Sequence, residues 1–118
     1  MNSKLILSVL AVIFVLFVGA AFLTRQPSAP SNLDSFAKCL ADKGATMYGA
    51  AWCPHCQNQK RLFGSSFQYV PYVECPNVPQ LCVDKGVSGY PTWIMGDTKL
   101  EGEQTLQKLS SISSCPLP

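Results

Sequence analysis

Residues 45–64 read ATMYGAAWCPHCQNQKRLFG, and this stretch decides the fold. Its first part, Ala45–Ala51, is short and apolar and predicts a buried strand that ends directly before a Cys-x-x-Cys pair. Pro54 suits the first turn of a helix, where a missing N–H costs nothing, and Gly64 suits a helix end. The stretch therefore predicts a strand followed by a helix that begins at two cysteines.

The two cysteines, Cys53 and Cys56, are called the dithiol below. At a helix start the first sulfur lies where free backbone N–H groups and the positive end of the helix dipole converge, which stabilises a thiolate. We therefore expect Cys53 to be the attacking and leaving sulfur in disulfide exchange. We expect Cys56, one turn further on and more buried, to resolve the mixed disulfide.

His55 is the only histidine of the chain and lies between the two sulfurs in sequence. A partly protonated imidazole at this place would favour the Cys53 thiolate further. Because a stabilised reduced form makes a disulfide more oxidising, the Pro54–His55 pair favours a disulfide donor or an isomerase over a strong reductant.

Two other interpretations of the dithiol are less favoured. A zinc site needs four ligands, usually from two closely spaced pairs, and the chain contains one Cys-x-x-Cys pair and one histidine. A purely structural Cys53–Cys56 bridge would close almost no loop and would stabilise little. We therefore expect neither a metal nor another cofactor.

The N-terminal segment Leu5–Leu23 contains no charged residue. A helix of about 19 residues spans roughly 28 Å, close to the roughly 30 Å of a bilayer core. A cleavable signal peptide is the alternative, because Val18–Ala21 contains the small residues of a cleavage site. The expected organisation is an anchor or signal over 1–25, a Pro/Ser linker over 26–32 and one domain over 33–118.

Both kinds of N-terminal segment imply export, and the cysteines agree with this. Six cysteines lie between Cys39 and Cys115, a density typical of an oxidising compartment. We expect a single-pass membrane protein whose domain faces the exoplasmic side, in the periplasm, the thylakoid lumen or an equivalent space. Lys4 and Arg25 account for the whole net charge of +2, so the rest of the chain gives no electrostatic case for binding nucleic acid.

Apolar periodicity and turn residues predict the remaining elements. Ser31 and Asp34 fit a capping box at the start of the first domain helix. Pro71 cannot donate to a ladder, which predicts that its strand lies at a sheet edge. The expected elements are a helix over 33–40, a strand over 70–74, a helix over 79–85, a hairpin of strands over 92–95 and 98–100, and a helix over 103–109. Their order predicts an α/β fold with a four-stranded mixed sheet flanked by helices.

These motifs resemble a known family. The segment Ala51–Cys56, followed by Gly89–Thr92, looks like a thioredoxin-fold active site with its cis-proline loop. The longer pattern is similar to the thioredoxin-like domain fused to bacterial and plastid vitamin K epoxide reductase homologues, over about Leu33 to Leu109. The segments that carry it are Phe36–Leu40, Lys43–Ala45, Met47–Gly49, Trp52–Cys56, Tyr72–Cys75 and Gly89–Trp93.

The resemblance implies a thioredoxin/glutaredoxin-like fold in which Cys53 and Cys56 exchange disulfides with exported proteins. It also implies that Pro91 is cis and presents the Tyr90 backbone to an extended substrate strand. In that family a membrane reductase passes the electrons to quinone. Only one spanning segment is expected here, so the resemblance implies that the quinone-linked partner is a separate protein.

One departure concerns the residue six positions before the first active-site cysteine. Thioredoxins carry a buried aspartate there that assists deprotonation of the second cysteine, and this chain has Met47. The absence of that proton acceptor fits an oxidant better than a thioredoxin-like reductant.

The other four cysteines allow three pairings. A turn with Pro76 and Pro79 can bring Cys75 to Cys82, which leaves Cys39 and Cys115 as the second pair. A redox relay through the first of these pairs is an alternative role for it.

The sequence thus favours a membrane-tethered thiol–disulfide oxidoreductase that oxidises or isomerises exported proteins. The alternatives are an outward-facing reductase for a specific client and a non-catalytic adaptor or chaperone that binds extended peptides at Pro91. Trp52, Tyr90 and Trp93 are candidates for an apolar collar around the dithiol, although Trp93 is better explained as a core residue.

Overall fold

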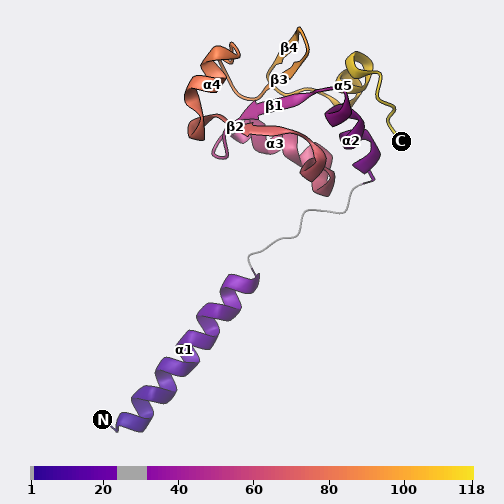
Figure 1. Ribbon diagram of the computed structural model, residues 1–118. Coiled ribbons are helices and arrows are strands. Elements are labelled where there is room, and N and C mark those ends of the chain that lie inside the picture. The colour runs from indigo at the N-terminus through magenta and orange to yellow at the C-terminus, as the bar shows by residue number, and fades with distance from the viewer. Residues whose placement is uncertain (1, 24–31) are drawn as a thin grey trace.

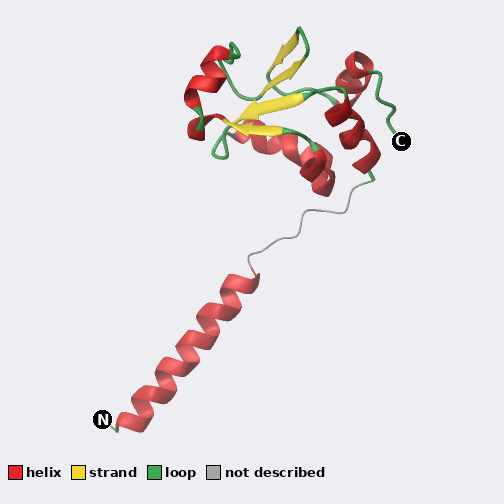
Figure 2. Cartoon of the chain, in the orientation of Figure 1, coloured by secondary structure: helices red, strands yellow, loops and turns green. Residues whose placement is uncertain are grey.

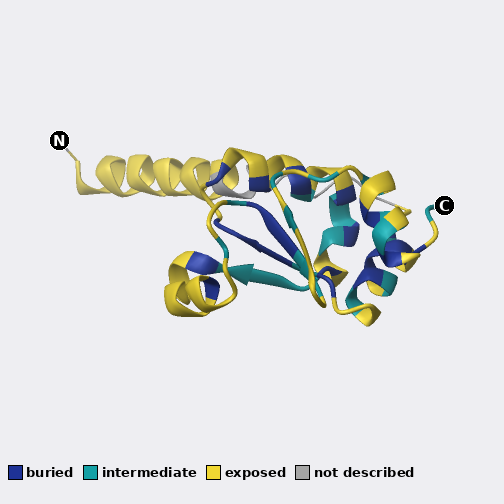
Figure 3. Cartoon of the chain, turned by 90° about the horizontal axis from the view of Figure 1, so that it is seen from above, coloured by how far each residue is buried: buried dark blue, intermediate teal, exposed yellow. Residues whose placement is uncertain are grey.

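The computed structural model describes residues 2–23 and 32–118. In the first range, Ser3–Leu23 forms helix α1, which is exposed along Ser3–Ala20 (Figure 3). The window Ser3–Ala20 has a mean hydropathy of 2.5 and is long enough to cross a membrane, and a signal sequence meets the same criteria. Residues 24–31, which include all but the last residue of the expected linker over 26–32, lie outside the described residues.

The domain is built on one sheet of four strands in the order β2-β1-β3-β4 (Figure 1). Strand β1 pairs in parallel with β2 and antiparallel with β3, and β3 pairs antiparallel with β4. The four strands are β1 at Thr46–Gly49, β2 at Tyr72–Glu74, β3 at Thr92–Met95 and β4 at Thr98–Glu101. The predicted four-stranded mixed sheet is confirmed, and β2 lies at an edge as Pro71 indicates.

Helices flank this sheet in a thioredoxin-like α/β fold (Figure 2). The described α-helices of the domain are α2 at Asp34–Asp42, α3 at Pro54–Phe63, α4 at Pro79–Asp84 and α5 at Leu106–Ser113. Two short 3-10 helices, η1 at Gly64–Tyr69 and η2 at Cys75–Asn77, follow α3 and β2.

The hydrophobic core is divided between the two faces of the sheet. On one face, Met47 of β1 lies opposite Trp93 of β3, and both are buried among side chains of α2, α3 and α5. Phe63 of α3 stacks on Phe36 of α2, with ring centroids 5.9 Å apart. The other face carries a smaller cluster around Tyr48 that includes α4. Helix α3, which carries the dithiol, is thus held in the larger core, and Trp93 is a core residue as expected.

A buried amide ties α3 to the rest of the domain. The Gln59 side chain is fully buried, and its oxygen accepts hydrogen bonds from the Trp93 indole at 3.3 Å and from the Gln104 backbone N–H at 2.6 Å. Its NH₂ group donates to the Gln104 carbonyl at 2.9 Å. Because the oxygen and the NH₂ group of this amide both have partners, burying it costs little free energy. Its hydrogen bonds hold α3 against β3 and the segment before α5.

One local prediction depends on a residue outside the described ranges, and another is wrong. The capping box needs Ser31, which is not described; helix α2 begins at Asp34 with Leu33 at its N-cap, and the Asp34 carboxylate accepts a hydrogen bond from the Ser66 hydroxyl. The last helix runs over Leu106–Ser113 and not over 103–109. The Thr105 side chain caps it by accepting from the Lys108 N–H at 3.0 Å.

Candidate active site

The dithiol lies at the start of α3. Cys53 is the N-cap residue, in an extended conformation, and Pro54 occupies the first turn. The Cys53 sulfur accepts a hydrogen bond from the Cys56 backbone N–H at 3.4 Å, so it satisfies one of the free donors of the helix start. This geometry gives an anionic sulfur at Cys53 both a donor and the favourable end of the helix dipole.

The two cysteines of the dithiol are free and differ in burial. Cys53 is 6% exposed, whereas Cys56 is completely buried. Burial raises the pKa of the Cys56 thiol to about 11, and the neighbouring Cys53 sulfur raises it further, while a backbone hydrogen bond with Ala50 and the charge of Lys60 oppose the shift. Cys56 is therefore a protonated thiol at neutral pH.

The loop before β3 packs against Cys53. The Tyr90–Pro91 peptide bond is cis, and the Cys53 thiol donates to the Tyr90 carbonyl at 3.7 Å. Trp52 is 68% exposed and meets the Tyr90 ring edge to face at 6.1 Å between centroids. The structure thus brings Cys53, Tyr90 and Pro91 together, with an exposed aromatic side chain beside them.

His55 lies on the first turn of α3 and is exposed. Its Nδ1 atom lies 3.3 Å from a carboxylate oxygen of Glu103, in the segment before α5. This pairing could not be predicted from the sequence, because the two residues are far apart in the chain. It means that a protonated His55 ring would be held by a carboxylate at the rim of the site.

A second polar cluster lies behind the dithiol, on the edge strand β2. The Tyr72 hydroxyl donates to one carboxylate oxygen of Glu74 at 2.6 Å, and the other oxygen accepts from the Ala51 N–H at 2.8 Å. Burial and the Glu74 charge raise the pKa of Tyr72, whereas the hydrogen bond from Tyr72 lowers the pKa of Glu74. Neither residue was predicted as part of the site.

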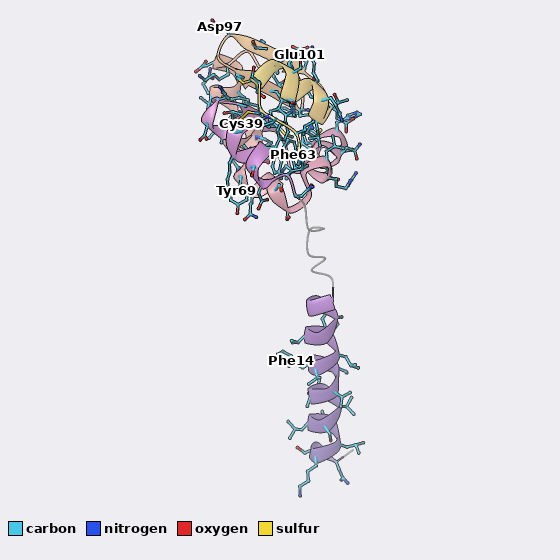
Figure 4. The ribbon with its side chains drawn as sticks, turned by 90° about the vertical axis from the view of Figure 1, so that its right-hand side faces the viewer. Phe14, Cys39, Phe63, Tyr69, Asp97 and Glu101 are labelled. Carbon is cyan, nitrogen blue, oxygen red and sulfur yellow. A yellow bond between two sulfur atoms is a disulfide. The ribbon has the colours of Figure 1, made fainter. Side chains whose placement is uncertain are left out.

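The remaining four cysteines form two disulfides. Cys39 at α2 is bonded to Cys115 after α5, and Cys75 in η2 is bonded to Cys82 in α4 (Figure 4 labels Cys39). These are the pairs that the sequence favoured. Cys75 and Cys82 are buried in the cluster around Tyr48, which is on the other side of the sheet from the larger core.

No group of three or more histidine, cysteine, aspartate or glutamate residues within 2–23 and 32–118 is arranged to hold a metal ion.

Fold and site together define a class: a thioredoxin-like α/β domain with a Cys-x-x-Cys dithiol at a helix start, beside a cis-proline loop. No family model matches the chain. Among curated proteins, the chain is 32% identical, over an alignment that is 136 positions long, to the thiol-disulfide oxidoreductase LTO1 of Arabidopsis thaliana. The alignment covers 92% of this chain and 36% of that protein, so the chain spans just over a third of the length of this relative.

Proposed function

We propose that this protein is a membrane-tethered thiol–disulfide oxidoreductase that oxidises or isomerises disulfides of exported proteins. The observation that carries the proposal is the free dithiol, with Cys53 at the N-cap of α3 and hydrogen-bonded to the carbonyl that precedes Pro91. The activity named for the relative in Arabidopsis thaliana, and the resemblance to domains fused to vitamin K epoxide reductase homologues, support the same activity.

The proposed oxidation of a client proceeds by two exchanges at Cys53. A client thiolate attacks the Cys53 sulfur of the Cys53–Cys56 disulfide, that bond breaks, and Cys56 leaves with the electron pair and takes up a proton. A second client thiolate then attacks the client sulfur of the mixed disulfide, and Cys53 leaves as a thiolate. The client gains a disulfide and the domain is reduced by two electrons.

The reduced domain must then be reoxidised. In the proposed cycle Cys53 attacks a disulfide of a quinone-linked membrane reductase, and Cys56 resolves the mixed disulfide. Met47 in place of a buried aspartate supports this direction, as does the thiolate-stabilising helix start at Cys53. Helix α1 is the proposed tether, with the domain on the exoplasmic side.

The reduction potential of the dithiol tests the direction of electron flow. The full chain in detergent micelles is equilibrated against glutathione buffers, and the redox state of the peptide that contains both cysteines is read by alkylation and mass spectrometry. A value between about −120 and −190 mV supports an oxidase or isomerase, whereas a value below about −250 mV identifies a reductant. Cys53→Ser is the control that must abolish the transition.

Two further measurements test the rest of the proposal. An intact N-terminus in the membrane-bound protein supports the tether, whereas a mature chain that begins near Ala21 contradicts it. A Cys56→Ser variant is expected to accumulate mixed disulfides with exported clients through Cys53. Client binding that persists in Cys53→Ser would instead identify a non-catalytic adaptor.

A further inference from the structure

Cys56 needs a route for its proton. A thiol with a pKa of about 11 is a thiolate in only about one molecule in 10⁴ at pH 7. Cys56 is also fully buried, so bulk water does not reach its sulfur directly. Met47, at the position where thioredoxins have an aspartate, offers no group that accepts a proton.

Gly49 shows which polar group borders the Cys56 thiol. A Cβ atom at Gly49 would lie 2.8 Å from the Cys56 sulfur and 3.4 Å from the Tyr72 hydroxyl oxygen. The thiol and the phenol therefore border one small space on the inner side of β1, and any residue larger than glycine would fill it.

Tyr72 connects this space to a carboxylate near the surface. Its hydroxyl donates to Glu74 at 2.6 Å, and the Glu74 side chain is only half-buried. The register of the parallel strands sets this arrangement, because Glu74 pairs with Gly49 at the ends of β2 and β1. A proton that reaches Glu74 can therefore pass on to solvent.

The cluster also contains a positive charge. Lys60 follows Cys56 by one turn of α3, and its ammonium lies 3.8 Å from the centre of the Tyr72 ring. It favours the anionic forms of both Cys56 and Glu74. The titratable groups that act on Cys56 or on its neighbours here are thus Cys53, Lys60, Tyr72 and Glu74.

We propose that Tyr72, positioned by Glu74, moves the proton of Cys56 during disulfide exchange. This inference rests on the proposed function. When Cys56 resolves a mixed disulfide at Cys53, its S–H proton passes to the Tyr72 oxygen and the phenol proton passes to the Glu74 carboxylate. The Cys56 sulfur bonds to the Cys53 sulfur, and the partner's sulfur leaves with the electron pair. In client oxidation the same path returns a proton to Cys56.

The experiment separates the two steps of oxidation. The reduced full chain in detergent is mixed with glutathione disulfide, quenched with acid and analysed by mass spectrometry between pH 6 and 10. The mixed disulfide at Cys53 reports the first step, and its conversion to Cys53–Cys56 reports closure. The variants are Tyr72→Phe, which keeps the ring beneath Lys60, and Glu74→Gln, which keeps an acceptor for the Ala51 N–H. Tyr69→Phe, which alters a tyrosine that contacts Lys38 instead, is the matched control.

We expect Tyr72→Phe and Glu74→Gln to slow closure at pH 7 by ~100-fold while the first step changes less than about twofold. In these variants closure should rise about tenfold per pH unit toward the pKa of Cys56, whereas the wild type and Tyr69→Phe should vary much less between pH 6 and 8. Loss of the near-ultraviolet circular dichroism spectrum in Tyr72→Phe would show that this variant is not folded. Glu74→Gln alone then tests the inference.

Two outcomes would overturn the inference in distinguishable ways. If the wild type closes and both variants close at the same rate and with the same pH profile, the proton path is refuted and the proposed function stands. If the wild type forms neither the mixed disulfide nor the closed form, the proposed function fails and the proton path fails with it.

Discussion

Alkaline pH should destabilise the reduced protein through Cys56. The folded state holds the pKa of this thiol at about 11, above its ordinary value of 9.0, because burial disfavours the thiolate. The stabilisation is fully present below pH 9 and is lost as the pH rises through 11, since the unfolded chain releases its proton first. One pKa unit corresponds to about 1.4 kcal/mol, so the expected loss is about 1.4 kcal/mol at pH 10 and ~3 kcal/mol above pH 11.

The assay is urea unfolding of the full chain in detergent at pH 7 and pH 10, followed by near-ultraviolet circular dichroism. The dithiol is kept reduced, and alkylation after each titration verifies that the two disulfides are intact. Cys56→Ala is the matched control, because it removes the titrating group and leaves Cys53 in place. Tyr72, whose pKa is also raised, adds a loss mainly above pH 10, and it does so in both proteins.

The wild type should therefore lose about 1.4 kcal/mol more than Cys56→Ala between pH 7 and pH 10. Equal losses in the two proteins would refute the reasoning, since they would mean that Cys56 titrates alike in the folded and unfolded chain. A smaller loss in the wild type would show that the fold favours the thiolate.

Four variants test the packing around the site by the same unfolding assay. Replacing Cys39 and Cys115 by alanine opens a loop with a sequence separation of 76 and should cost about 4–5 kcal/mol; a cost under about 1 kcal/mol would contradict the loop-entropy argument. Gly49→Ala brings a Cβ atom to 2.8 Å from the Cys56 sulfur and should cost about 1–3 kcal/mol, whereas a neutral result would show that the thiol moves freely. Thr105→Ala removes the cap of α5 and should cost ~1 kcal/mol; Thr105→Ser, which keeps the hydroxyl, should restore most of it.

The part of the site that is local in sequence could be predicted from the sequence. Pro54 and Gly64 mark the two ends of α3, because a proline fits a first turn and a glycine adopts the positive φ of 54° at the helix end. Once the helix start is fixed, backbone geometry places Cys53 at the N-cap, and the packing of α3 into the larger core buries Cys56.

The contacts of the site that depend on register could not be predicted in the same way. Glu74 meets Ala51 because β1 and β2 pair in parallel with Gly49 opposite Glu74, and a strand of three residues carries too little alternation to define that register. The sequence did contain one usable signal for Glu74. Parallel strands bring their carboxyl ends to the same edge of a sheet, so a residue at the end of β2 is expected near the start of α3, which follows β1.

The starts of α2 and α5 depend on different kinds of contact. Thr105 caps α5 by accepting from the Lys108 N–H three residues further on, so the signal for this helix start is local in the sequence. The Asp34 carboxylate at the start of α2 instead accepts a hydrogen bond from Ser66 of η1, an element that apolar periodicity did not reveal. Only the contact at α2 is therefore a tertiary one.

The Cys39–Cys115 bond makes a covalent ring of nearly the whole domain, and the ring contains the dithiol. A protease that cuts one peptide bond anywhere between these two residues opens the ring without releasing a fragment. Both pieces stay joined to the segment that bears α1 until the bond is reduced. A nicked domain should therefore migrate as one species on a non-reducing gel and as two after reduction. Before reduction, both pieces would stay linked to α1.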